Sequence, residues 1–165
     1  LISLTVGNNH RTQELYETDC VEVCCSMLEE RVENLEDGDT VESLLRVLLN
    51  LACDEDIIPR IDSSGGIEKI ILCLYRFPQH GGVQYAGDKT LHNIALDNPV
   101  LATKAKDLRA IELIDLAQSR FPNYPALIEW GEKSKEVIRE ASAAGQQGSG
   151  AWDVGHMTDS SESDE

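Results

Sequence analysis

Short segments of this 165-residue chain recur 43 or 44 residues apart, and this repeat constrains the fold more than any other feature. The segment 48–52 (LLNLA) returns as 91–95 (LHNIA), and Arg-Phe-Pro occurs at 76–78 and again at 120–122. Two unrelated motifs that agree on one spacing indicate consecutive copies of a single structural unit. Helical units of about 40–47 residues stack in line, because one unit cannot cover its own apolar faces.

Apolar residues follow the period of an amphipathic helix. One stripe, at i, i+3, i+4 and i+7, consists of Val41, Leu44, Leu45 and Leu48. The same spacing recurs in the segments that begin at Cys20 and Ile67. Because no segment sustains the two-residue alternation of a strand between hairpin turns, the sequence predicts an all-α fold.

Turn residues divide one unit into three helices. A short helical segment over 56–62 ends at a Gly-Gly break, 65–66, and a second helix over 66–77 follows. A loop that contains Gly81 and Gly82 leads to a longer third helix over 83–96. Thr40 and Asn98 are typical of helix N-caps and precede a stripe and a proline, respectively.

With these features the chain resembles the armadillo repeat family. The residues that carry the resemblance are 48–55 (LLNLACDE), 64–71 (SGGIEKII) and 91–98 (LHNIALDN). The resemblance covers roughly residues 1–140, as about three units. It implies an α-solenoid, an armadillo-like superhelix whose third helices line a concave groove that binds extended peptides or partner helices.

The first and last units depart from the family's pattern. Arg109 and Ala110 stand where the middle unit has its glycine pair, and Asp19 and Cys20 stand there in the first unit. A long acidic insertion over 29–39 also interrupts the first unit. These two units are therefore expected to be partial or degenerate.

The resemblance places four candidate binding residues in the groove. Asn50 and Asn93 would hydrogen-bond the main chain of a partner, since a side-chain amide offers both a donor and an acceptor; Ser3 holds the equivalent position of the first unit. One turn earlier, where importin-type grooves carry a tryptophan, this chain has Arg46 and Lys89. A cation at that place favours a partner segment that bears carboxylates.

Each of these assignments has an alternative. Asn50 and Asn93 could instead be solvated or cap the following loop, since asparagine favours helix ends. Arg46 and Lys89 could be surface charges that balance Glu42 and nearby acids. The strongly acidic first third of the chain could serve a basic partner, so the sequence leaves the polarity of the ligand open.

The overall charge excludes some functions. With 30 acidic against 14 basic residues, the net charge is −16 and the pI is about 4.5. Nucleic-acid binders neutralise phosphates with lysine and arginine, so no nucleic-acid partner is expected. The chain has no run of about 18 apolar residues, so no membrane partner is expected either.

We expect two regions, a helical repeat domain over 1–144 and a disordered acidic tail over 145–165. The tail contains five acids and no lysine or arginine, and little that could be buried. Its Trp152 is a candidate docking anchor. Because the sequence opens with Leu1 inside an apolar stretch, we expect it to be an N-terminally truncated part of a longer chain.

Chemical motifs point away from catalysis. The five cysteines lack zinc spacing, and Cys20, Cys24 and Cys73 lie on or beside apolar stripes, as expected for core residues in the cytoplasm or nucleus. His92 and Trp130 are expected on a helix surface and in helix packing, respectively. No catalytic residue, cofactor-binding residue or metal ligand is predicted, and the chain is not expected to be an enzyme.

The function predicted from the sequence is that of a scaffold or adaptor that binds a partner protein along the concave groove. Two alternatives remain. The domain could regulate a small GTPase or a chaperone by binding a folded surface, or it could be the targeting arm of a larger enzyme.

Overall fold

The computed structural model describes residues 19–33 and 37–148, and within these ranges the chain forms eight helices and no strand. They are α2 (Cys20–Arg31), α3 (Gly38–Leu51), α4 (Ile58–Ser63), α5 (Gly66–Arg76), α6 (Gly81–Ala95), α7 (Pro99–Asp107), α8 (Ala110–Arg120) and α9 (Pro125–Gly148). The all-α prediction is confirmed for this part of the chain.

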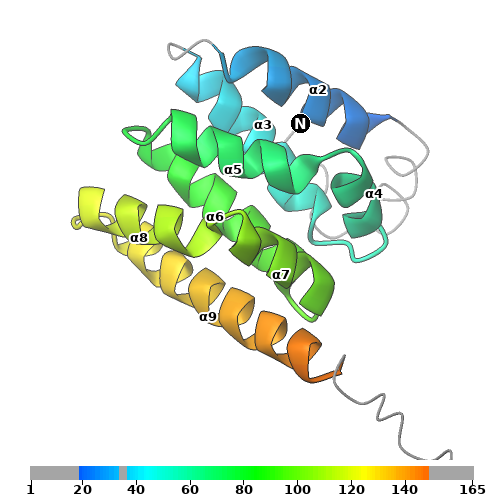
Figure 1. Cartoon of the computed structure of the whole chain (residues 1–165). Coiled ribbons are helices and arrows are strands. Elements are labelled where there is room, and N and C mark those ends of the chain that lie inside the picture. The colour runs from blue at the N-terminus through cyan, green and yellow to red at the C-terminus, as the bar shows by residue number, and fades with distance from the viewer. Residues whose placement is uncertain (1–18, 34–36, 149–165) are drawn as a thin grey trace, which may run out of the picture.

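The helices stack in three layers along the chain, as Figure 1 shows: α2 with α3, then α4 to α6, then α7 to α9. Helix α6 packs between α3 and α9, and α5 contacts both α2 and α8. Helices that begin 43 or 44 residues apart therefore lie beside one another, and we call α3, α6 and α9 the third helices. This adjacency brings residues of three separate segments onto one face.

One apolar core runs through all three layers. It includes Leu48 of α3, Ile70 of α5, Leu91 of α6, Ile114 of α8 and Ile138 of α9, each fully buried. The stripe predicted on the helix after Thr40 is buried as expected, because α3 packs against both α2 and α6. Each layer thus hides its apolar stripe against the next one.

The arginines of the repeated Arg-Phe-Pro motif tie each layer to the one before it. Arg76 donates hydrogen bonds to the carbonyl oxygens of Val32, at 3.3 Å, and Glu33, at 3.4 Å. Arg120 donates to the carbonyl oxygen of Pro78 at 3.2 Å. Since these carbonyls follow the ends of the preceding helices, each guanidinium satisfies backbone groups that the helix itself leaves free.

Local sequence signals predict one helix start correctly and another wrongly. Asn98 caps α7 as predicted, accepting a hydrogen bond from the backbone N–H of Leu101 at 3.1 Å. Thr40 is not an N-cap, because α3 already begins at Gly38 and places Thr40 inside its first turn. Gly38 is buried against His80, and a Cβ at this position would lie 2.4 Å from the ring, which explains why the helix starts on a glycine.

Helix α9 extends to Gly148, past the boundary predicted at residue 144. Ser142 is buried, and a Cβ on Gly145 would lie 3.0 Å from the Cβ of Pro99, so this end of α9 packs on the start of α7. The predictions for Ser3, for Trp152 and for the rest of the acidic tail fall outside the described residues. No described helix has both the length and the apolar character that a bilayer span requires.

Candidate functional site

Polar and aromatic side chains of the three third helices contact one another across the layers, and we call them, together with the asparagines one turn after Arg46 and Lys89, the third-helix face. It consists of Arg46 and Asn50 on α3, Tyr85, Lys89 and Asn93 on α6, and Trp130 and Lys133 on α9. All four residues predicted as a binding site belong to this face. Adjacent helices bring them together, since α6 packs directly against α3 and α9.

Arg46 is paired within its own helix. Its Nε lies 2.7 Å from Oε1 of Glu42, one turn earlier, and its guanidinium carbon lies 5.9 Å from the ring centre of Tyr85 on α6. The ion pair matches the alternative in which Arg46 balances Glu42. The stacking on Tyr85 adds a contact between layers that the alternative did not include.

Lys89 lies between two aromatic rings. Its Nζ is 4.2 Å from the ring centre of Trp130 and 5.4 Å from that of Tyr85, and it is 3.4 Å from the Tyr85 hydroxyl. Lys133 lies over the same Trp130 ring at 4.6 Å and pairs with Glu129 at 2.6 Å. Aromatic faces attract cations, so the rings hold both ammonium groups on this face.

The two asparagines occupy equivalent places on α3 and α6. Asn93 donates from Nδ2 to Sγ of Cys53 at 3.6 Å, across the boundary between the first two layers. Cys53 is exposed and also contacts the carbonyl of Leu49 at 3.5 Å. Both asparagines are half-buried, so part of each side chain faces solvent.

The sequence analysis missed three members of this face. Lys133 lies 44 residues after Lys89, so extending the repeat into the last unit would have found it. Trp130 was expected to be a packing residue of the last helix. It is half-buried, and the ammonium groups of Lys89 and Lys133 lie against its ring. Tyr85 has no counterpart in the other units, and only the packing of α3 beside α6 reveals its role.

His92 is more enclosed than predicted. Its ring meets that of Trp130 edge to face, with centres 5.4 Å apart, and its Nδ1 is buried without a hydrogen-bond partner. Burial lowers the pKa of His92, and the nearby ammonium groups of Lys133 and Lys89 lower it further. The imidazole is therefore neutral near pH 7 and packs edge to face with the Trp130 ring.

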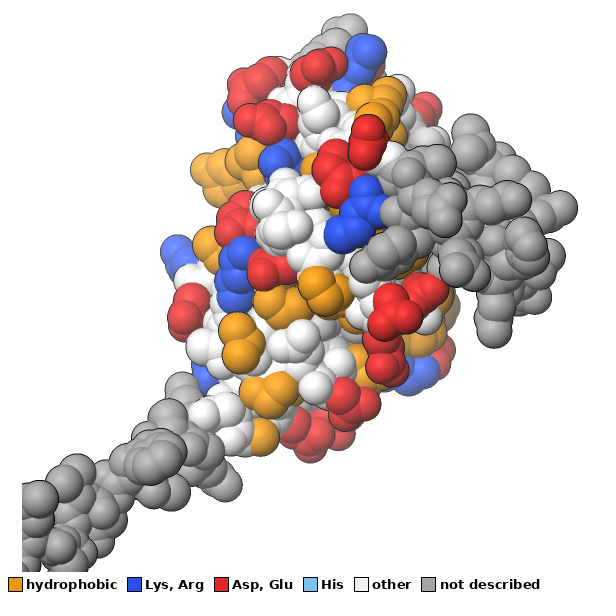
Figure 2. All heavy atoms as spheres, turned by 90° about the vertical axis from the view of Figure 1, so that its right-hand side faces the viewer, with side chains coloured by type: hydrophobic (Ala, Val, Ile, Leu, Met, Phe, Trp, Pro, Cys, Tyr) orange, Lys and Arg blue, Asp and Glu red, His pale blue; other side chains and the backbone are white. Residues whose placement is uncertain are grey.

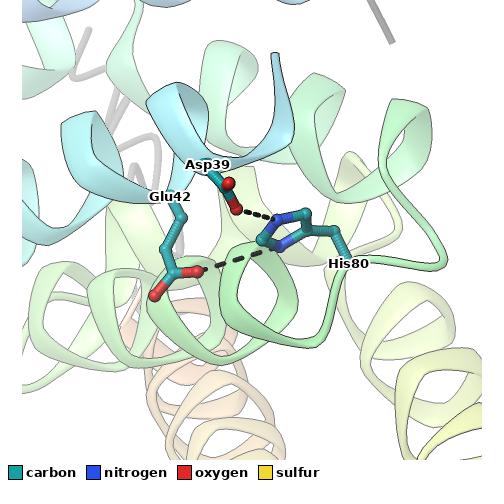
Figure 3. A group of neighbouring side chains, drawn as sticks. All are labelled: Asp39, Glu42 and His80. Carbon is teal, nitrogen blue, oxygen red and sulfur yellow. Dashed lines mark hydrogen bonds and ion pairs between the residues drawn. The ribbon is translucent and has the colours of Figure 1, made fainter. Parts of the chain in front are cut away.

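A second cluster joins the first two layers and adjoins the third-helix face through Glu42, the partner of Arg46. Figure 3 shows Asp39 and Glu42, from the first turns of α3, each pointing toward one nitrogen of the His80 ring, which precedes α6. Nε2 of His80 is 3.0 Å from Asp39 Oδ1, and Nδ1 is 3.8 Å from Glu42 Oε2. A histidine and two carboxylates at such distances could in principle hold a divalent cation.

The hydrogen bonds of the His80 ring argue against a metal site. Nδ1 accepts the backbone N–H of Val83 at 3.2 Å and so caps α6, which leaves the proton on Nε2, where it is donated to Asp39. A metal on Nε2 would displace this proton to Nδ1 and break the cap. Asp39 is also fully exposed. The cluster is therefore better explained as a helix cap that links α3 to α6 than as a metal centre.

Four buried titratable groups are poorly placed for catalysis. Burial raises the pKa of Cys24 to about 12, of Cys25 to about 11 and of Cys73 to about 12, so these thiols are not nucleophiles near pH 7. Burial also raises the pKa of Asp88 well above its usual range, although the ammonium of Lys135 opposes the shift. Asp88 is fully buried, and a group without access to solvent or substrate cannot act as a general acid.

The other surfaces are mixed. Figure 2 shows acidic, basic and apolar side chains interspersed on the side where α4 and α7 lie, without the single-sign basic field typical of nucleic-acid binding. Between α5 and α8, an open and mostly apolar depression of about 380 Å³ includes Tyr75 and Leu116, whose exposed fractions are 67% and 55%.

Comparison with protein-family models, with curated proteins and with solved structures finds no match to this chain.

Proposed function

We propose that this chain is a non-catalytic binding module of armadillo type, which holds an extended segment of a partner protein along the third-helix face. On this proposal the three layers are successive solenoid units, and the third-helix face is the wall of a groove. The recurrence of α3, α6 and α9 at one spacing supports this interpretation, because stacking such units produces a long surface lined by equivalent helices.

The observation that carries the proposal is the composition of that face. Arg46, Lys89 and Asn93 come from two helices that pack directly together, and they combine charged groups and an amide with two aromatic rings. Interfaces are enriched in such rings and in arginine, and amide groups pair with a peptide main chain whatever its sequence. Because all the groups lie on packed helices, the face is preorganised, which lowers the entropic cost of binding.

The asparagines supply the test. A library of random peptides is selected on the chain, and the selected peptides are then measured on the double variant Asn50→Ala with Asn93→Ala. We expect affinity to fall about tenfold or more, since each variant removes hydrogen bonds made to the ligand main chain. Asn123→Ala, at an exposed turn before α9, is the matched control and should leave affinity unchanged.

Circular dichroism and melting temperature of the double variant must match those of the parent, so that lost affinity reports the face itself. Peptides that bind the double variant as tightly as the parent would show that the asparagines do not line the binding site. Protection of the exposed Cys53 thiol by bound peptide gives an independent readout, since Cys53 contacts Asn93.

The depression between α5 and α8 supports a second candidate function, the binding of a folded surface such as that of a small GTPase or a chaperone. Tyr75 and Leu116 expose apolar area there beside Arg76 and Arg120. Binding that survives the double asparagine variant but is lost in Tyr75→Ser with Leu116→Ser would favour this second function.

A further inference from the structure

The three third helices carry cations at equivalent places, but the middle one is paired differently. Arg46, Lys89 and Lys133 follow one another at spacings of 43 and 44 residues. Arg46 has Glu42 one turn earlier and Lys133 has Glu129, at 2.7 Å and 2.6 Å. At the equivalent place before Lys89 the chain has Tyr85.

Lys89 therefore lacks the carboxylate that its two counterparts have. Within the described ranges, no carboxylate oxygen lies within 4.0 Å of its Nζ, whose polar contact is the Tyr85 hydroxyl. The rings of Tyr85 and Trp130 hold the ammonium in place without neutralising it, because a ring attracts a cation only through its quadrupole. A ligand carboxylate could meet both the ammonium and a hydroxyl donor here, which makes a strong charge-assisted pair.

The two outer cations, Arg46 and Lys133, can also bind ligand carboxylates if these replace Glu42 and Glu129 as their partners. Both ion pairs are partly exposed, with exposed fractions of 36% and 23% for Arg46 and Glu42, and 46% and 63% for Lys133 and Glu129. Pairs of this kind contribute little free energy, so a ligand carboxylate can replace the internal one at small cost. The net charge of −16 opposes an acidic ligand at long range, but physiological salt screens charges beyond about 8 Å.

The packing of the helices sets the spacing of the ligand's charges. Axes of packed helices lie about 8–10 Å apart. A chain in the extended polyproline II conformation has three residues per turn and rises about 3.1 Å per residue, so residues i, i+3 and i+6 lie on one side at intervals of about 9 Å. We infer, on the basis of the proposed function, that the partner segment is extended and acidic, with carboxylates at i, i+3 and i+6, and that its central carboxylate binds Lys89.

The test uses labelled synthetic peptides of about 12 residues and fluorescence anisotropy with the full chain at physiological salt. One peptide places glutamates at i, i+3 and i+6 in a background of serine and alanine. A second peptide has the same composition with the three glutamates adjacent, and a third has glutamine at the three spaced positions. We expect the spaced glutamate peptide to bind about tenfold more tightly than either of the others.

Lys89→Met keeps the apolar stem over the two rings and removes only the charge. It should lower affinity for the spaced peptide about tenfold, to the level of the adjacent-glutamate peptide. Lys106→Met, which removes an exposed lysine from α7, is the matched control and should have no effect. Equal binding of the spaced and adjacent peptides, or full affinity in Lys89→Met, would overturn the inference.

Two further outcomes distinguish this inference from the proposed function and from binding of the chain's own acidic end. If the selected library peptides depend on Asn50 and Asn93 but show no preference for spaced acids, the proposed function stands and the acidic ligand is wrong. A full chain with Asp159, Glu162, Asp164 and Glu165 replaced by amides should bind the spaced peptide as the parent does. A tenfold gain in that variant would make the chain's own acidic end the occupant and overturn the assignment to a partner.

Discussion

Gly65 and Arg109 adopt the same left-handed backbone conformation, with φ of 68° and 66°, at the residue before α5 and α8. They lie 44 residues apart, at equivalent places in the second and third layers. Glycine reaches this conformation without strain, whereas an arginine Cβ approaches the neighbouring carbonyl oxygen. The backbone break between first and second helices is therefore kept even where the sequence has lost its glycine.

This comparison predicts that Arg109→Gly stabilises the fold by about 1 kcal/mol, the usual cost of a left-handed non-glycine residue. The exposed pair of Arg109 with Glu112, at 3.4 Å, is lost in the variant but contributes little. Urea unfolding followed by circular dichroism measures the change. Gly65→Ala is the reverse control and should lower the free energy of unfolding by a similar amount. An unchanged free energy of unfolding in Arg109→Gly would show that Arg109 is not strained in the third layer.

Asp88 gives the fold a pH dependence that Asp88→Asn should remove. Burial between α6 and its neighbours raises the pKa of this carboxyl, so the folded state keeps its proton to higher pH than the unfolded state does. As pH rises from about 4, the unfolded chain loses this proton first and the fold loses stability, by about 1.4 kcal/mol per pH unit, until the raised pKa is passed.

The asparagine variant does not titrate, so its stability relative to the parent should increase with pH. We expect the difference in unfolding free energy between the two proteins to grow between pH 4 and pH 8. Unfolding curves at several pH values measure it, with Asp107→Asn on the exposed end of α7 as the control for charge alone. Parallel stability profiles of parent and variant would show that Asp88 is charged or solvated in the fold.

The sequence was sufficient to predict most of the helices and their order, because apolar stripes and turn residues are local signals. It predicted a short helix over 56–62, where the structure has α4 (Ile58–Ser63). It also predicted a longer helix over 83–96, where the structure has α6 (Gly81–Ala95). The starts were less accurate, as at Thr40, because the contact between Gly38 and His80 lies between residues 42 positions apart. A local sequence pattern does not predict contacts between residues so far apart in the chain.

The candidate site could be predicted only in part for the same reason. Asn50 and Asn93 stand in recurring motifs, and Arg46 and Lys89 were found by counting back one turn. Trp130 and Tyr85 do not recur, so no repeat points to them. The role of Tyr85 depends on the approach of α3 to α6. That of Trp130 depends on the approach of α6 to α9, which sets the 4.2 Å distance from Lys89 to Trp130 and which the chain order alone does not give.

His80 should act as a helix cap and not as a metal ligand. His80→Ala removes the acceptor for the backbone N–H of Val83 and the pair with Asp39, so we expect a loss of about 1 kcal/mol in unfolding free energy. His80→Asn should recover most of this loss, because asparagine is among the best N-caps. Addition of zinc or of a chelator should leave the melting temperature of the parent unchanged, and a rise with zinc would contradict the assignment of the proton to Nε2.

Cys53 should be the fast-reacting thiol of the five cysteines. It is exposed, Cys20 is partly buried, and the other three are buried with a raised pKa, which keeps them protonated and enclosed near pH 7. A thiol reagent added to the native protein should therefore label one cysteine rapidly, and Cys53→Ser should abolish the rapid phase. Because Cys53 lies beside Asn93 on the third-helix face, a bound peptide should slow this phase without changing the slow ones. Rapid labelling that is unaffected by a saturating selected peptide would place the peptide elsewhere on the protein.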